Sequence, residues 1–238
     1  TKTKDCVSQH PNSAINMGYF GEYTRTFEDL LKARVAIKHK DFEKAGKMLD
    51  GKLAPYLNDP AQAKALSGAL KLAINSVYGL TIARFENAFR HPDNVNNIVA
   101  LRGALFMATL REVLESEGYF VVHIKTDSIK VANPDEKSDM IIDELGKKYG
   151  YELETEHVFE KICLVNKSTY IAKLAKDDPE DPGKWTATGD QFQVPYVFKT
   201  LFSHEKIDLN DLSEVKSVKT ALYLDMNEGL PQGTHNYV

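Results

Sequence analysis

Three polar residues in the segment KLAINSVYGL, residues 71–80, share one face of a predicted helix. Lys71, Asn75 and Tyr78 stand at positions i, i+4 and i+7, and residues at this spacing lie above one another on a helix. Apolar residues occupy the other sides of the helix, so the polar stripe is turned away from them. The stripe is therefore either an ordinary solvated face or one wall of a polar site.

Three cations are expected to meet beside this stripe, because the preceding segment forms the other arm of a helical hairpin. A glycine and two prolines in residues 51–60 interrupt the helical pattern between the two arms. With a turn in the middle of that segment, position 38 faces position 71 and position 34 faces position 75, so Arg34, Lys38 and Lys71 converge. Convergent like charges favour a polyphosphate ligand. A loosely solvated basic face is the alternative.

Two aspartates are predicted at the ends of strands in one sheet. Asp5 lies at the end of a strand in residues 1–20, before a Pro-Asn-Ser turn, and Asp127 lies at the tip of a β-hairpin predicted from HIKTDSIKV, residues 123–131. Two aspartates on adjacent strands can hold two Mg²⁺ ions about 4 Å apart, an arrangement that supports phosphoryl or nucleotidyl transfer. An aspartate that only forms the turn is the alternative.

Composition argues against several other classes of site. The chain of 238 residues is 42% hydrophobic and 27% charged, and its net charge of −4 gives no overall signal for nucleic-acid binding. Two cysteines and seven scattered histidines indicate neither a disulfide framework nor a zinc site, which favours a reducing cytoplasm. No apolar run approaches the roughly 20 residues that span a bilayer, so we expect no membrane partner.

Hydrophobic periodicity predicts the remaining elements. Two helices over residues 26–50 and 61–79 form the hairpin, and a third helix, capped by Asp93, runs to Gly118. The further elements are a helix opened by Pro134 over residues 135–149, two strands over 151–176 and short helices over 190–224. This order predicts an α+β fold in which a sheet domain carries a helical insertion.

Five segments, in order, resemble the motifs of the family B DNA polymerases. DCVSQHPNS resembles motif A, DxxSLYPS; KLAINSVYG matches motif B, KxxxNSxYG, at every signature position; HIKTDS resembles motif C, usually YGDTDS. LLKARVAIK is similar to the fingers helix that supplies an arginine and a lysine four residues apart, and NKSTYIAKL is similar to the KxY strand that contacts primer–template. The motifs cover about residues 5–174, and QFQVPYVFKTLFS resembles phage-encoded or viral members.

The resemblance implies an antiparallel palm-type sheet flanked by helices, with an inserted helical-hairpin fingers sub-domain. Residues 1–20 would be the palm strand with motif A, 21–90 the fingers, 91–190 the palm with the motif C hairpin and the KxY-like strand, and 191–238 the incomplete start of a thumb or C-terminal extension. The chain would then be the palm and fingers portion of a larger enzyme, and the exonuclease and thumb portions would be its partners.

The implied activity is that of a DNA-directed DNA polymerase, a nucleotidyltransferase that joins a dNTP to a primer 3′-hydroxyl on template DNA. Asp5 and Asp127, with the backbone carbonyl of Cys6, would hold two Mg²⁺ ions, for which Mn²⁺ can substitute. The resemblance also implies that the enzyme works in the cytoplasm, which is the host cytoplasm if the chain is phage-encoded.

Further residues match positions that bind the nucleotide in the family. Arg34, Lys38 and Lys71 would grip the triphosphate, and Lys71 would also protonate the pyrophosphate leaving group. Asn75 and Tyr78 would line the pocket for the nascent base pair.

Two of the matched segments depart from the family pattern, the one that resembles motif A and the one that resembles the DNA-contacting KxY strand. His10 stands where the family has a tyrosine that stacks under the sugar and excludes a 2′-hydroxyl. Tyr170 matches the tyrosine of the KxY motif, whereas Ser168 replaces its lysine, for which Lys167 would compensate.

Lys125 is the main departure, because the family has an aspartate two residues before the metal-binding one. Residues 125 and 127 would point to the same sheet face in an ideal strand, so the lysine changes the local charge by two units. Lys125 and Thr126 would contact DNA instead, at a phosphate or the primer end. The alternative is a catalytically silent, polymerase-like module for nucleic-acid binding or assembly, and an isolated fragment would also be inactive.

Overall fold

The computed structural model describes residues 1–94, 96–189, 192, 194–217 and 234–237. The chain divides into two compact units. We call residues 4–129 and 134–154 the helical unit, and residues 1–3, 130–133 and 155–238 the strand unit. No helix in the described parts of the chain has the length and apolar character needed to cross a membrane.

The helical unit consists mainly of helices that lead into and out of one β-hairpin. Its elements in chain order are the end of β1 (Lys2–Cys6), α1 (Gln9–Asn16), η1 (Gly21–Tyr23), α2 (Thr24–Lys38), α3 (Phe42–Lys47), η2 (Leu49–Gly51), η3 (Ala54–Tyr56), α4 (Pro60–Thr81), η4 (Pro92–Asn94), α5 (Ile98–Ser116), β2 (Val121–Lys125), the start of β3 (Ser128–Val131) and α6 (Glu136–Tyr149).

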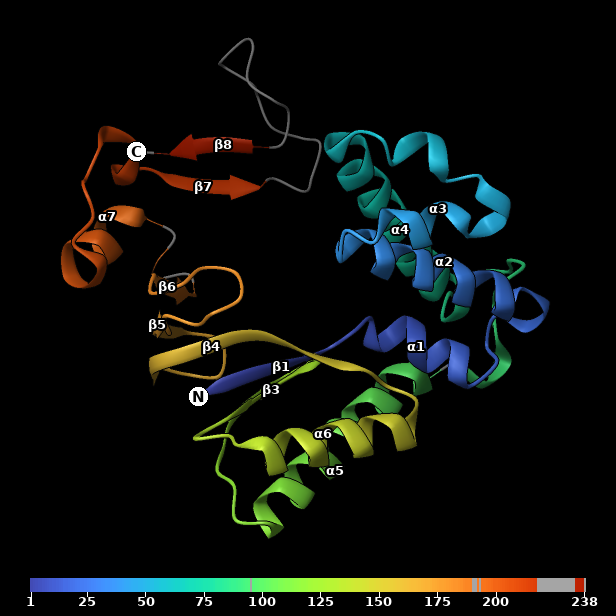
Figure 1. The fold of residues 1–238 in the computed structure, drawn as a ribbon, viewed down its shortest axis with the longest axis horizontal. Helices are drawn as coiled ribbons and strands as arrows, with labels where there is room; N and C mark the ends of the chain where they lie inside the picture. Colours follow the sequence, from blue (N-terminus) through green and yellow to red (C-terminus); the bar gives the residue numbers. More distant parts are fainter. Residues whose placement is uncertain (95, 190–191, 193, 218–233, 238) are drawn as a thin grey trace. The chain divides into compact units, whose positions relative to one another are not determined.

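The strand unit carries most of the remaining strands. Its elements are β4 (Leu153–Leu164, whose first two residues belong to the helical unit), β5 (Tyr170–Leu174), β6 (Trp185–Thr188), α7 (Pro195–Phe198), the π-helical turn η6 (Lys199–Ser203), η7 (Leu209–Leu212), β7 (Glu214–Ser217) and β8 (Thr234–Tyr237). The six-stranded sheet has the order β2-β3-β1-β4-β5-β6, and β7 pairs with β8 separately (Figure 1). The predicted mixture of helices with an antiparallel sheet is confirmed.

The predicted helical hairpin forms from α2 and α4, which pack through small and aliphatic side chains. Ala33, Ile37, Ala63 and Leu70 are buried in this core. The prediction of one helix over residues 26–50 is wrong, because α2 ends at Lys38 and α3 begins only at Phe42. Two features cause the break: Lys40 has a left-handed backbone, and the Asp41 carboxylate accepts the Lys44 N–H as the cap of α3.

The start of α4 shows why its prediction over residues 61–79 is close to the observed helix. Asp59 accepts the backbone N–H of Ala61, and Pro60 occupies the first helical position, where a missing N–H costs nothing. The helix then continues to Thr81, two residues past the predicted end.

Two predictions of local structure in the helical unit are wrong. The Pro-Asn-Ser segment is not a turn but lies inside α1, because Pro11 falls in the first turn, where proline is tolerated. Asp93 does not cap the third helix; it lies in η4, and α5 begins at Ile98 after Asn97, which has a left-handed backbone. Pro134 precedes α6, which is capped by Asp135 and Ser138 in a reciprocal capping box.

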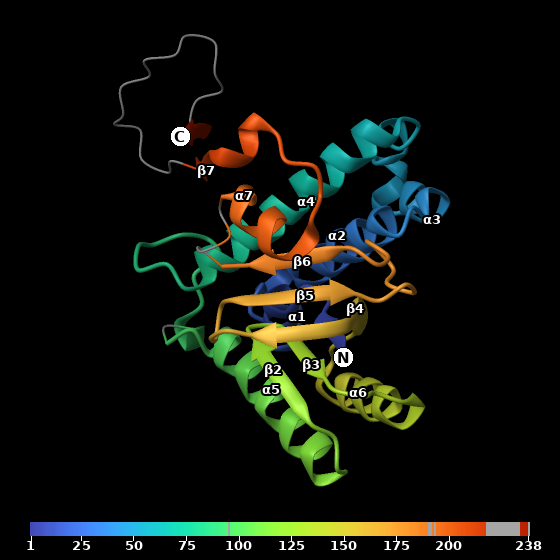
Figure 2. The ribbon, with the colours of Figure 1, turned by 90° about the vertical axis from the view of Figure 1, so that its left-hand side faces the viewer.

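The strand unit is built on antiparallel pairing of β4 with β5 and of β5 with β6, as the alternation over residues 151–176 predicts for the first pair. Figure 2 shows these three strands as neighbours. Phe159, Ala172 and Leu174 form a small buried core on this sheet. The short helices predicted over residues 190–224 are present in part, as α7, η6 and η7; residues 218–224 lie outside the described residues.

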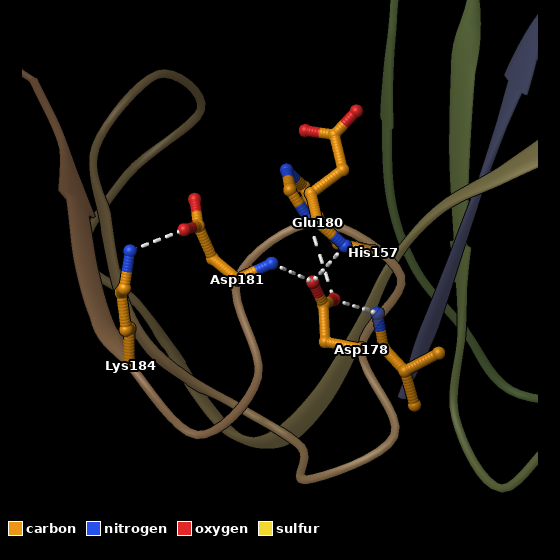
Figure 3. Close-up of polar contacts among 6 residues, drawn as sticks. His157, Asp178, Glu180, Asp181 and Lys184 are labelled. Carbon is orange, nitrogen blue, oxygen red and sulfur yellow. Dashed lines mark hydrogen bonds and ion pairs between the residues drawn. The ribbon is translucent and has the colours of Figure 1, made fainter.

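A buried carboxylate organises the loop that follows β5 (Figure 3). The Asp178 side chain is fully buried and accepts the backbone N–H groups of Val158, Glu180 and Asp181 at 2.8–3.0 Å. His157 Nδ1 lies 3.4 Å from the same carboxylate. Burial alone would raise the pKa of the Asp178 carboxyl, but these donors and His157 outweigh it and lower the pKa. Asp178 therefore ties the loop to β4.

Candidate active site

One cavity of about 500 Å³ in the helical unit gathers residues that are far apart in the sequence. It is lined from the end of β1, the start of α1, the facing sides of α2 and α4, the β2–β3 turn and the start of β4. The predicted metal, catalytic and nucleotide-binding residues all line it: Asp5, Cys6, His10, Arg34, Lys38, Lys71, Asn75, Tyr78 and Asp127. The convergence expected from the hairpin geometry is therefore observed.

The two aspartates meet where β1 and the β2–β3 turn lie side by side. The backbone N–H of Cys6 donates to the carbonyl of Asp127 at 2.8 Å, which joins the end of β1 to the turn. Burial raises the pKa of the Cys6 thiol, and the negative charges of Asp5 and Asp127 raise it further. The carboxylate of Asp5, in β1, and that of Asp127, in the β2–β3 turn, thus act on the same buried thiol.

The start of α1 brings a strained residue to the cavity. Ser8 precedes the helix with a left-handed backbone at φ 50°, a conformation that residues other than glycine adopt at a cost. Its hydroxyl does not cap the helix but accepts a hydrogen bond from Arg34 Nη1 at 2.9 Å. This contact fixes one cation of the hairpin against the end of the strand that carries Asp5.

The three predicted cations line the cavity in different electrostatic settings. Burial lowers the pKa of the Arg34 guanidinium, although the charge of Glu154 partly opposes this, and Arg34 Nε is buried with no hydrogen-bond partner among the described residues. Lys38 forms an ion pair with Glu154. Lys71 is exposed on α4 and forms no ion pair with a described residue. A desolvated or unpaired cation favours an anionic ligand.

His10 and Tyr78 form an aromatic contact on one side of the cavity. Their ring centroids lie 5.2 Å apart, and the Tyr78 hydroxyl donates to Asn97 Oδ1 at 2.8 Å. Burial raises the pKa of Tyr78, and the hydrogen bond to Asn97 partly opposes this. Asn97 thereby connects the end of α4 to the start of α5 and holds the Tyr78 ring beside His10.

The predicted DNA-binding residues lie outside this cavity. Lys125 and Thr126 are exposed at the end of β2 and in the following turn, and neither lines the cavity. The expectation that residues 125 and 127 share a sheet face is wrong, because β2 ends at Lys125 and Asp127 belongs to the turn. Tyr170 begins β5 in the strand unit, where its ring lies 5.5 Å from Lys130 Nζ, and Lys167 is exposed in the β4–β5 turn.

The sequence did not predict the part played by Glu154 and Ser8. Glu154 lines the cavity, and its carboxylate contacts both Lys38 and His39 Nε2, the latter at 3.1 Å. Burial opposes ionisation of Glu154, but the two hydrogen bonds outweigh it and lower the pKa of the carboxyl. The only available signal was the alternation of YELE at the start of β4, which places Glu152 and Glu154 on one face.

The donors present fit Mg²⁺ only as a partly protein-bound ion. Among the described residues no group of three or more His, Cys, Asp or Glu side chains could hold a metal. Mg²⁺ in phosphate-transferring sites is commonly held by one or two carboxylates, with water and substrate phosphates completing its coordination. Asp5 and Asp127 supply two hard carboxylates to the lining of a cavity that also contains three cations, so they fit such an ion.

Neither comparison with known proteins assigns this chain to a family: no protein-family model matches it, and a search of curated proteins found no match. The chemistry that the site can support is therefore inferred from the residues that line the cavity. A cavity that is lined by both carboxylates and cations is suited to a metal-bound polyphosphate.

Proposed function

We propose that this chain is the palm and fingers portion of a family B DNA polymerase, with the sheet as the palm and the α2–α4 hairpin as the fingers. It transfers a nucleotide from a dNTP to a primer 3′-hydroxyl under the direction of a template. One observation carries the proposal: nine residues picked from separate polymerase-like motifs line a single cavity of about 500 Å³.

The cations of the hairpin bind the triphosphate in this proposal. Arg34, fixed by Ser8, and Lys38 neutralise charge on the phosphates, and Lys71 is placed to protonate the departing pyrophosphate. Asp5 and Asp127, with the Cys6 carbonyl, would hold two Mg²⁺ ions, for which Mn²⁺ can substitute; when bound, the ions would supply charge stabilisation for nucleotidyl transfer.

The other side of the cavity selects the nucleotide. Asn75 and Tyr78 line the space for the nascent base pair, and His10 packs beside Tyr78, where its flat imidazole lies under the sugar. We expect discrimination against a 2′-hydroxyl to depend on His10.

Primer–template DNA is the proposed macromolecular partner. Lys125, Thr126, Lys167 and Tyr170 contact it, chiefly through phosphates, and DNA affinity should therefore fall as salt rises. The exonuclease and thumb portions of the same polymerase complete the enzyme, and the reaction takes place in the cytoplasm, of the host cell for a phage-encoded chain.

Lys125 is the observation that favours the alternative, a catalytically silent module that keeps the polymerase shape. A lysine beside the metals would oppose their binding by like charge. Lys125, however, is exposed and does not line the cavity, whereas Asp127 does. We therefore favour the catalytic reading.

Primer extension by the full chain, with Mg²⁺ or Mn²⁺, tests the proposal. Asp127→Asn removes a metal-binding charge with little change in side-chain volume and should lower incorporation more than about 100-fold. Mutation of residues that only hydrogen-bond to metal ligands already lowers metal affinity or activity by about 10–100-fold. Asp143→Asn, which removes a carboxylate from the exposed face of α6, is the matched control and should extend primers normally. Normal extension by Asp127→Asn would contradict the proposal, and extension by the unchanged chain would exclude the silent module.

A further inference from the structure

Glu154 places a carboxylate against the cations of the cavity, and nothing in the proposed chemistry uses it. One oxygen of Glu154 pairs with Lys38 Nζ, and the other lies 3.1 Å from His39 Nε2. Its charge also acts on the Arg34 guanidinium. Glu154 thus faces three basic groups of α2 and of the residue that follows it.

The lining of the cavity is balanced in charge because of this residue. Among the described residues that line it, Arg34, Lys38 and Lys71 carry positive charge, and Asp5, Asp127 and Glu154 carry negative charge. Divalent cations would offset the charges of the two aspartates, and the charge of Glu154 is offset by its contacts with Lys38 and His39. A polyanion that enters the cavity therefore competes with Glu154 for Lys38.

The backbone around Glu154 makes it a fixed competitor rather than a mobile one. The carbonyl of Glu152 accepts the Val7 N–H at 2.9 Å, and the Leu153 side chain is buried. These contacts hold the start of β4 against the chain that leads into α1. His39 remains as a partner for the carboxylate when Lys38 is drawn away, so that release of Lys38 does not leave the Glu154 carboxylate without a partner.

We propose that Glu154 is a built-in competitor for Lys38 and sets the affinity of the cavity for polyphosphate. Its ion pair neutralises Lys38 before the ligand arrives, and the bound phosphates take over the ammonium group. Affinity is kept below the value that three unopposed cations would give, which favours release of a polyphosphate product. The inference rests on the proposed function only in taking the ligand to be a polyphosphate.

The test is the affinity of the full chain for tripolyphosphate, measured by isothermal titration calorimetry at low ionic strength with EDTA. Glu154→Gln keeps the shape of the side chain, frees Lys38 and should tighten binding by about two- to fivefold, the range that exposed ion pairs support. Glu152→Gln removes the same charge two residues away, from an exposed side chain that does not line the cavity, and should leave affinity unchanged.

A double-variant comparison separates direct competition from a general change of charge. In a Lys38→Met background, Glu154→Gln should give no gain, because the contested cation is absent. Unchanged or weaker binding by Glu154→Gln alone overturns the inference, as does an equal gain with Glu152→Gln or in the Lys38→Met background. Circular dichroism spectra of all variants should be superimposable.

The outcomes also separate this inference from the proposed function. If the chain binds tripolyphosphate more tightly with Glu154→Gln but adds the same nucleotide whatever the template base, the polymerase is refuted and the competitor is kept. If the chain extends primers while Glu154→Gln leaves the tripolyphosphate affinity unchanged, the polymerase is supported and the competitor is refuted. Absence of binding by every variant, including Glu154→Gln, overturns the competitor, whereas the polymerase is judged by primer extension.

Discussion

At the scale of single residues, the three cations of one helical hairpin differ in their burial and in their contacts. Arg34 is half-buried and fixed by Ser8, Lys38 is shared with Glu154, and Lys71 is exposed with no ion pair to a described residue. An ammonium group without a fixed partner can reach a leaving group and give up its proton, so Lys71 is the best placed of the three to act as an acid.

Replacing Lys71 tests that role. Lys71→Ala should lower the single-turnover rate of nucleotide incorporation by about 10²-fold or more, the usual contribution of a positioned general acid. Lys64→Ala, two turns earlier on α4, is the control, because Lys64 is equally exposed and does not line the cavity. Equal single-turnover rates for the two variants would show that Lys71 does not act as the acid.

At the scale of elements, the sequence predicted the composition of the site better than the details of local structure. Helical periodicity and an antiparallel hairpin are enough to put Arg34, Lys38 and Lys71 together, because both depend only on local spacing. The break after α2 was missed because it depends on the left-handed backbone of Lys40 and the cap at Asp41. α1 was missed because a Pro-Asn-Ser segment is typical of a turn and is also tolerated in a first helical turn.

Glu154 could not be found from sequence for a different reason. It meets Lys38 across 116 residues of chain, and no motif spacing encodes that contact. The alternation in YELE indicates a strand with two acidic residues on one face, but only the packing of β4 against the chain leading into α1 decides that Glu154 lines the cavity. Contacts of this kind require the tertiary structure.

The loop after β5 offers a prediction about stability. Asp178→Asn keeps the shape of the buried side chain but removes its charge and replaces one acceptor oxygen by a donor NH₂ facing backbone N–H groups. It should lower the free energy of unfolding by about 1–3 kcal/mol at pH 7. Fluorescence of Trp185, the single tryptophan, reports denaturant unfolding of the strand unit. Asp181→Asn, which breaks only a surface pair with Lys184, should cost less than about 1 kcal/mol.

The same pair of variants has a defined pH dependence. The pKa of Asp178 is lowered in the folded chain, so its stabilising contribution is present above the unfolded pKa and is lost as the pH falls through the folded value. The difference in stability between the unchanged chain and Asp178→Asn should therefore shrink as the pH is taken from 7 into the acid range. A difference that is constant or grows in acid would show that the Asp178 charge does not stabilise the loop.

At the scale of the whole molecule, the proposed polymerase combines a metal-bound triphosphate site with the reading of a template. The carboxylates and cations alone would suit many phosphate-transferring enzymes. His10 and Tyr78, which contact each other, line the same cavity as Asn75, and these three residues are the reason for proposing that the cavity selects the nucleotide.

Incorporation of single nucleotides opposite defined template bases tests whether the chain reads a template. Four primer–templates that differ only in the first unpaired template base are each offered the four dNTPs singly, with the full chain and Mg²⁺ or Mn²⁺. We predict that the nucleotide added changes with the template base and is its complement in every case. Addition of the same nucleotide on all four templates would contradict the proposed function.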